Sequence, residues 1–219
     1  GLQAIGCLKS LQHLDLSRCI KITDEGLQAI GSLTQLQHLD LTGCGRVRSL
    51  DALSFLEESL QYLGLSGCSN LTPGALSALT NLASLQYLDL SQSDYLDDDG
   101  LFTLVPRDMQ QPLASLRHLD LSNCSEITDE GLWALKPLST LEFVDLKNCD
   151  HITVREIEKI LPDIEFAVEV EQLQRDYSDE SDDSDDSDDS DDSDDSDDSD
   201  DSDDSDDSDD SSLYVTVSP

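Results

Sequence analysis

Apolar and polar residues alternate along most of the chain in a phrase that recurs about every 25 residues. The apolar residues Leu14 and Leu16, for example, flank the polar residue Asp15. Such alternation predicts a short β-strand with one buried face. The phrase begins at Leu11, Leu36, Leu60, Leu85, Leu116 and Leu141, at separations of 25, 24, 25, 31 and 25 residues. Six copies of one unit predict a repeat architecture.

A helix signal follows the strand in each unit. Residues 22–30 and 127–135 both begin Ile-Thr-Asp-Glu-Gly-Leu, and Leu27 and Ile30 stand three residues apart, which is the spacing of a helical apolar stripe. The candidate helix caps are Thr23 or Asp24 in the first copy and Thr128 or Asp129 in the fifth. One strand and one helix per repeat predict an α/β fold, a curved right-handed solenoid with a parallel concave sheet and outer helices.

The two ends of the repeat region extend the same pattern. Residues 1–6 repeat residues 26–31, so we expect a helix there whose own strand is absent, as in a fragment of a longer chain. Residues 164–170 alternate as a further strand. The acidic residues Glu165 and Glu169 make that strand polar enough that we expect it to end the stack.

Charge divides the chain into two parts. Residues 176–210 hold 23 acidic side chains and no basic one, whereas residues 1–175 hold 26 acidic and all 12 basic residues of the chain. Ten Ser-Asp-Asp triplets fill residues 181–210 and offer almost no apolar surface to offset the entropy of ordering. We therefore expect a solenoid domain over residues 1–175, with six full repeats and partial ends, and a disordered acidic tail over residues 176–219.

The tail has several possible roles. Its serines lie in the acidic surroundings that acidophilic kinases prefer, and each phosphate would add about −1.5 to −2 charges. A tail of this kind could bind basic proteins or, weakly, Ca²⁺, or it could increase solubility. The alternative is an expanded nine-nucleotide repeat that was merely tolerated.

The repeat phrase resembles a known family. Leu11–Leu27 and Leu116–Leu132 follow nearly in full the pattern Leu-x-x-Leu-x-Leu-x-x-Cys-x-x-Ile-Thr-Asp-x-Gly-Leu of the cysteine-containing leucine-rich repeats. The resemblance covers roughly residues 1–170, and implies a module that binds protein partners. It extends to the repeat half of F-box proteins, which recruit substrates to ubiquitin ligases, and of the related mitotic-exit antagonists. A ubiquitin-ligase adaptor becomes an implied partner if an F-box lies upstream.

The cysteines occupy one position of the repeat. A spacing of 24 or 25 residues is unlike a zinc site, and a small buried residue explains the position better. Reduced thiols of this kind favour a cytoplasmic or nuclear location, and we expect no cofactor and no metal. The residues at this position are Cys19, Cys44, Cys68, Ser93, Cys124 and Cys149.

Strand residues between the buried leucines should face the concave surface in three columns. The first column holds His13, His38, Tyr62, Tyr87, His118 and Phe143. The second holds Asp15, Asp40, Gly64, Asp89, Asp120 and Asp145. The third holds Ser17, Thr42, Ser66, Ser91, Ser122 and Lys147. Rings beside carboxylates predict that the first two columns, apart from Gly64, bind a protein partner with cationic groups. The alternative is that these residues fill a repeat consensus and simply tolerate solvent.

Other classes of function find little support in the sequence. We recognise no phosphate-binding glycine loop and no nucleophile elbow, so we expect no enzyme. Acidic surfaces repel phosphates, which disfavours a nucleic-acid partner. No window approaches the roughly 18 apolar residues of a membrane span, so we expect no membrane partner. The fourth repeat is six residues longer than its neighbours, and the excess around 105–112 is a candidate contact loop.

Overall fold

The computed structural model describes residues 2–106, 113–169 and 214–217, and their strands form a single sheet in chain order. The first seven strands are parallel to one another. They are β1 (His13–Asp15), β2 (His38–Asp40), β3 (Tyr62–Gly64), β4 (Tyr87–Asp89), β5 (His118–Asp120), β6 (Phe143–Asp145) and β7 (Glu165–Glu169).

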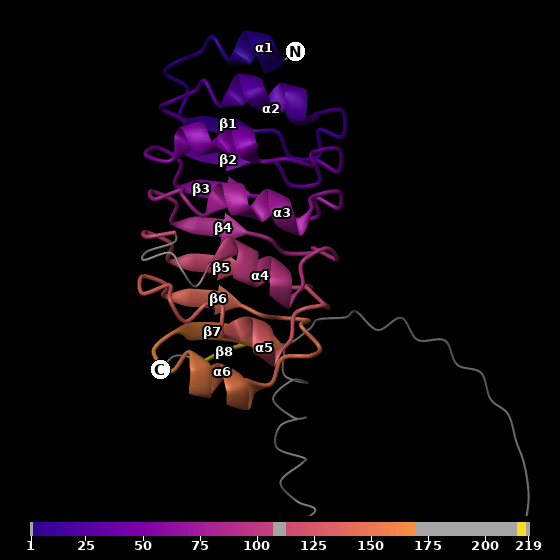
Figure 1. The fold of residues 1–219 in the computed structure, drawn as a ribbon, viewed down its shortest axis with the longest axis vertical. Helices are drawn as coiled ribbons and strands as arrows, with labels where there is room; N and C mark the ends of the chain where they lie inside the picture. The colour runs from indigo at the N-terminus through magenta and orange to yellow at the C-terminus, as the bar shows by residue number, and fades with distance from the viewer. Residues whose placement is uncertain (1, 107–112, 170–213, 218–219) are drawn as a thin grey trace, which may run out of the picture.

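Helical segments lie between successive strands. Figure 1 shows strands and helices as two stacks that run side by side along the long axis of the molecule. This arrangement confirms the expected solenoid, with a parallel sheet on one side and helices on the other. The helical segments are α1 (Leu2–Ile5), α2 (Asp24–Ile30), the 3₁₀-helix η1 (Asp51–Leu56), α3 (Pro73–Leu76), the 3₁₀-helix η2 (Ser77–Leu79), α4 (Asp98–Leu104), α5 (Asp129–Leu132) and α6 (Val154–Ile160).

The core lies between the two stacks. Leu39 at the centre of β2 and Leu119 at the centre of β5 are fully buried, as are Leu27 and Ile30 of α2. These residues join one continuous apolar cluster that runs through all the repeats. Because each repeat buries its apolar side against its neighbours, burial of each leucine contributes about 1.5–3 kcal/mol that a single repeat could not obtain alone.

The helical segment after β2 differs from the expected α-helix. Residues 51–56 form a 3₁₀-helix, in which side chains three residues apart share a face. Leu50, Leu53 and Leu56 have this spacing, and all three are fully buried. The repeat is also one residue shorter and lacks the Thr-Asp-x-Gly sequence that begins α2 and α5. A tighter helix therefore covers the core at this point.

Of the two candidate caps at each helix start, the threonine occupies the cap position. Thr23 precedes α2 and Thr128 precedes α5, both in extended backbone conformation, although the side chain of Thr23 makes no capping hydrogen bond. The hydroxyl of Thr128 accepts a hydrogen bond from the backbone N–H of Glu130 at 3.2 Å. The following aspartates, Asp24 and Asp129, are the first helical residues, so their carboxylates are available for other contacts.

The repeated cysteine position is buried in four of the five predicted cases. The thiols of Cys68 and Cys124 donate hydrogen bonds to the backbone oxygens of Leu41 and Leu90 in the preceding repeat, at 3.1 and 3.3 Å. Cys44 and Cys149 do the same. The prediction is wrong for Cys19, which is exposed. Among the described residues β1 has no strand before it, so no carbonyl of a preceding repeat covers this thiol.

The C-terminal end of the sheet confirms one prediction and corrects another. Strand β7 matches the strand expected over residues 164–170. It does not end the sheet, because β8 (Tyr214–Val217) pairs with it in antiparallel orientation. These four residues belong to the stretch expected to be disordered. Their sequence, Tyr-Val-Thr-Val, favours a strand, and the edge of β7 offers unpaired backbone groups. The Ser-Asp-Asp triplets and residues 107–112 of the candidate contact loop lie outside the described residues.

Candidate protein-binding face

The first two columns line up across the sheet face that points away from the helices, here called the open face. Strand pairing places His13 beside His38, His38 beside Tyr62, and so on to Phe143. The same register aligns the aspartate column. The middle residue of each strand points the other way and is buried, as the burial of Leu14 and Leu39 shows. The two columns therefore share one face of the sheet, and all their residues are exposed or half-buried except Gly64 and Asp145, which are buried.

The side chains of the first column form an unbroken ladder of six rings. The centroids of His38 and Tyr62 are 4.0 Å apart with an interplanar angle of 11°, and those of Tyr62 and Tyr87 are 4.9 Å apart at 14°. The His13–His38 distance is 5.7 Å. On the other side of Tyr87 the ladder loosens, since both the Tyr87–His118 and His118–Phe143 distances are 6.1 Å. Rings stacked in this way cover one another's faces and turn their edges toward solvent, so the ladder forms a continuous apolar ridge.

Each aspartate of the second column has a structural role at the end of its strand. Its Oδ1 atom accepts a hydrogen bond from the backbone N–H two residues later, as Asp40 does from Thr42 at 2.8 Å and Asp89 from Ser91 at 2.9 Å. The same turn occurs at Asp15, Asp120 and Asp145. The turn at the end of each strand is thus stabilised by this aspartate. This supports, in part, the alternative that the aspartate column fills a repeat consensus.

Gly64 interrupts the aspartate column for a steric reason. A Cβ atom at this position would lie 2.8 Å from Oδ1 of Asp40 and 3.2 Å from its Cγ. The Asp40 carboxylate leans over β3 while it accepts from Thr42. Gly64 makes room for that carboxylate.

The environment of the carboxylates changes along the column. Burial raises the pKa of Asp120, and the neighbouring charges of Asp89 and Asp145 raise it further, although hydrogen bonds from Ser122 act in the opposite direction. At the N-terminal end, hydrogen bonds from Ser17 hold the pKa of the exposed Asp15 below its usual value. Negative charge is therefore crowded around Asp120, which lies beside Asp89 and the buried Asp145.

Two of the rings are phenols whose ionisation is suppressed. Burial raises the pKa of Tyr62, and it raises the pKa of Tyr87 to about 12; nearby aspartates raise both. Both side chains stay neutral at physiological pH and can donate a hydrogen bond.

A small cavity opens where the ladder loosens. It has a volume of about 50 Å³ and is lined by Tyr87, His118, Leu119, Asp120, Phe143 and Asp145. Sequence reasoning identified five of these residues but not the cavity, because the ring spacing depends on packing between repeats. It placed Lys147 in the third column but did not predict its ion pair with Asp145, in which the ammonium lies 2.7 Å from Oδ2. The signal was available, since Lys147 replaces serine or threonine in the third column.

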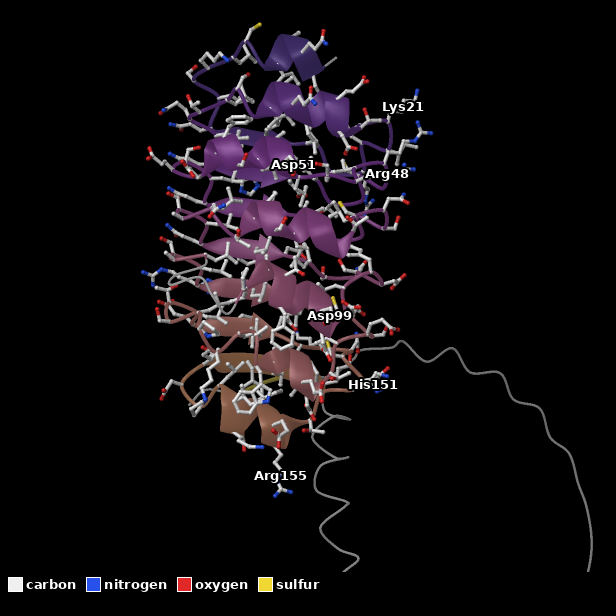
Figure 2. The ribbon with its side chains drawn as sticks, viewed as in Figure 1. Lys21, Arg48, Asp51, Asp99, His151 and Arg155 are labelled. Carbon is white, nitrogen blue, oxygen red and sulfur yellow. The ribbon has the colours of Figure 1, made fainter. Side chains whose placement is uncertain are left out.

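Two exposed basic side chains, Lys21 and Arg48, lie at an edge of the stack. Figure 2 shows both extending outward from it. Among the described residues, no group of His, Cys, Asp and Glu has the arrangement needed to hold a metal ion. Within the same residues, no helix combines the length and apolar character needed to cross a lipid bilayer.

The comparisons with known proteins agree with this geometry. Residues 9–55 match a family described as Leucine Rich repeats (2 copies), and residues 81–105 and 113–136 match one described as Leucine Rich repeat. Together with the parallel sheet, these matches show a leucine-rich-repeat solenoid. They do not extend to the narrower resemblance to F-box proteins. No curated protein matches the chain significantly.

Several solved structures are similar in part. A chain of the yeast Rad7–Elc1 complex is 23% identical, with a TM-score of 0.49 over 64% of this chain and 36% of that one. An internalin (InlF) of Listeria monocytogenes is 20% identical, with a TM-score of 0.48 over 73% of this chain and 52% of that one. TLR13 in complex with single-stranded RNA is 25% identical, with a TM-score of 0.43 over 58% and 17%. The chain thus spans from about one sixth to about half the length of these structures.

Proposed function

We propose that this chain is a protein-binding module that holds its partner on the open face of the sheet. The observation that carries the proposal is the unbroken ladder of six rings from His13 to Phe143. Leucine-rich repeats generally mediate protein–protein interaction, and aromatic side chains dominate the energetics of such interfaces.

The ring column supports binding more strongly than the aspartate column does. Each aspartate closes a turn at the end of its strand, so the fold itself accounts for it. The backbone does not require rings in the first column. His13 and His118 are exposed there, and the other four side chains are half-buried. A run of rings that the backbone does not require is well explained by a partner that covers it.

The charge of the open face indicates the chemistry of the partner. Five carboxylates follow the ring ladder, and the exposed cations Lys21 and Arg48 lie on the edge of the stack. A partner surface with arginine or lysine side chains would bind the carboxylates, while its apolar groups packed against the edges of the rings. Phosphate groups would meet like charge.

The test compares two pairs of ring substitutions in the full chain. His38→Ala with Tyr62→Ala removes the tightest part of the ladder, whereas Phe55→Ala with Trp133→Ala removes two exposed rings on the helical side, 73% and 43% accessible. We expect the first pair to lose the partners that quantitative mass spectrometry finds on the wild-type chain, and the second pair to keep them. Circular dichroism of both variants checks that the fold is intact.

A third variant distinguishes binding by the open face from binding by the acidic tail. Replacing the triplets of residues 181–210 by Ser-Gly-Gly triplets removes the tail's charge and keeps its length. Loss of the partners from this variant, with their retention by the His38/Tyr62 pair, would overturn the proposal in favour of tail binding.

A more specific role is substrate recognition for a ubiquitin ligase of the F-box type. It is supported by the Leu11–Leu27 and Leu116–Leu132 phrases, which resemble the repeats of that class. The test is co-purification of the product of the complete transcript with a ligase adaptor. Absence of the adaptor from a preparation that retains open-face partners would leave a scaffold role.

A further inference from the structure

The ring ladder is not uniform, and its loose end coincides with a cavity. Centroids 4.0 and 4.9 Å apart leave no space between His38, Tyr62 and Tyr87. Beyond Tyr87 the spacing grows to 6.1 Å, and the planes of His118 and Phe143 diverge by 41°. The cavity of about 50 Å³ lies at this point, with three rings and two carboxylates in its lining.

The size of the cavity limits what can enter it. A cavity needs roughly 10–15 Å³ to hold one water molecule. A cavity of about 50 Å³ therefore has room for about four non-hydrogen atoms. A guanidinium group consists of one carbon and three nitrogens and is flat. An indole or phenol ring is too large to enter without displacing a ladder ring.

The charges around the cavity favour a cation. Asp120 accepts hydrogen bonds from the backbone N–H and hydroxyl of Ser122 through Oδ1, which leaves Oδ2 for another donor. Lys147 already forms an ion pair with Asp145, at 2.7 Å, and offsets its charge. In the part of the chain that the structure describes, no ion pair offsets Asp120, which lies near both Asp89 and Asp145.

We infer that the cavity between β4, β5 and β6 is a receptor pocket for an arginine side chain of the partner. The guanidinium lies against the rings of Tyr87, His118 and Phe143 and donates to Asp120. Arginine fits better than lysine because its planar, weakly hydrated head stacks on rings while it binds a carboxylate. The inference rests on the proposed function and names the group that the open face recognises.

The experiment is an NMR titration of the full chain with N-acetyl-arginine N-methylamide. Its control is N-acetyl-citrulline N-methylamide, which has nearly the same shape and no charge. We expect saturable shifts of the His118 and Phe143 ring resonances with the arginine probe and none with citrulline. Equal binding of the two probes, or no saturable shift at these rings, overturns the inference. Equal or tighter binding of the corresponding lysine derivative overturns the choice of arginine.

Two matched variants locate the site. Asp120→Asn removes the charge and keeps an oxygen acceptor for Ser122, and we expect roughly tenfold or greater weakening of the arginine probe, the usual cost of losing a charged hydrogen bond. Asp99→Asn makes the same change at an exposed residue of α4, outside the open face, and we expect no effect. Equal weakening in both variants means a diffuse acidic surface and overturns the pocket.

Failure of the pocket is distinguishable from failure of the proposed function. If the His38/Tyr62 pair loses the partners and Asp120→Asn keeps them, the open face binds its partner and the arginine pocket is wrong. If the His38/Tyr62 pair keeps the partners, the proposed function fails, whatever the probe titration shows.

Discussion

Asp98, in the first turn of α4, accepts two hydrogen bonds from Thr128 of the next repeat. Its Oδ1 atom lies 2.9 Å from the backbone nitrogen of Thr128, and its Oδ2 atom lies 2.7 Å from the hydroxyl. Asp129 binds Thr153 in the same way, at 2.8 and 3.0 Å. The aspartate at the first helical position therefore joins one repeat to the next, while the residue before it caps the helix: Asp97 accepts from the backbone N–H of Gly100 and Thr128 from that of Glu130.

Removing this link should lower the stability of the fold. We expect Asp98→Ala to reduce the free energy of unfolding by about 1–3 kcal/mol, because it leaves the backbone N–H of Thr128 without its acceptor in a partly buried site. Asp99→Ala changes the next residue of the same turn, which is exposed, and should change stability by less than about 0.5 kcal/mol. Urea unfolding followed by circular dichroism measures both, and equal effects would show that the link is unimportant.

Gly131 makes the link possible, because a Cβ atom there would overlap Oδ1 of Asp98 and crowd Leu101. We expect Gly131→Ala to destabilise the chain by about 1–3 kcal/mol. Its effect should be much smaller in an Asp98→Ala background, where the obstructing carboxylate is absent. Gly74→Ala is the matched control, since the nearest atom to its Cβ is 3.9 Å away, and removing a helical glycine should stabilise by about 0.5–1 kcal/mol. Additive effects of Gly131→Ala and Asp98→Ala would contradict this account.

The six cysteines should separate into two classes of reactivity. Cys7 and Cys19 are exposed, whereas Cys44, Cys68, Cys124 and Cys149 are buried. Burial raises the pKa of Cys68, Cys124 and Cys149 to about 12, so the reactive thiolate is scarce at pH 8.

We therefore expect Ellman's reagent at pH 8 to modify two thiols rapidly in the folded chain and the other four only on unfolding. The double variant Cys7→Ser with Cys19→Ser should lose the rapid phase and keep the slow one. Rapid modification of Cys124, detected by peptide mass mapping, would show that the helices open more readily than their packing indicates.

Asp15 and Asp120 should titrate on opposite sides of the usual aspartate pKa of 3.8. Burial raises the pKa of Asp120, and hydrogen bonds from Ser17 lower that of Asp15. Carboxyl ¹³C NMR measures both values directly. If the pKa of Asp120 were lower than that of Asp15, burial and neighbouring carboxylates would not be the dominant influences on Asp120.

These shifts have opposite consequences for stability. Because the folded state binds the Asp120 proton more tightly than the unfolded state, this residue's contribution falls as pH rises from 3.8 through the folded pKa. Asp15 contributes stability that is present above pH 3.8 and is lost as pH falls through its lowered pKa. We expect Asp120→Asn to be more stable than the wild type at pH 7 and to lose that advantage at low pH. Denaturant unfolding at both pH values tests this.

The sequence alone determined the repeat, the parallel sheet and the columns of the open face. Side chains in a strand alternate with a period of two, and equal repeats must stack in register if each is to bury its leucines. Because Leu14 and Leu39 point into the core, their neighbours His13 and His38 must point to the opposite face of the sheet. The strand over residues 164–170 followed from the same alternation.

Tertiary structure decided several features that differ between repeats of similar sequence. The exposure of Cys19, the spacing of His118 and Phe143, and the partner of Asp98 all depend on contacts between residues about 25 to 30 positions apart. Pairing of β8 with β7 joins segments still further apart. A local pattern fixes which way a side chain points, but the space between two side chains depends on the volumes packed beneath them and on whether a neighbouring repeat is present. For that reason the sequence predicted the open face, and only the fold located its cavity.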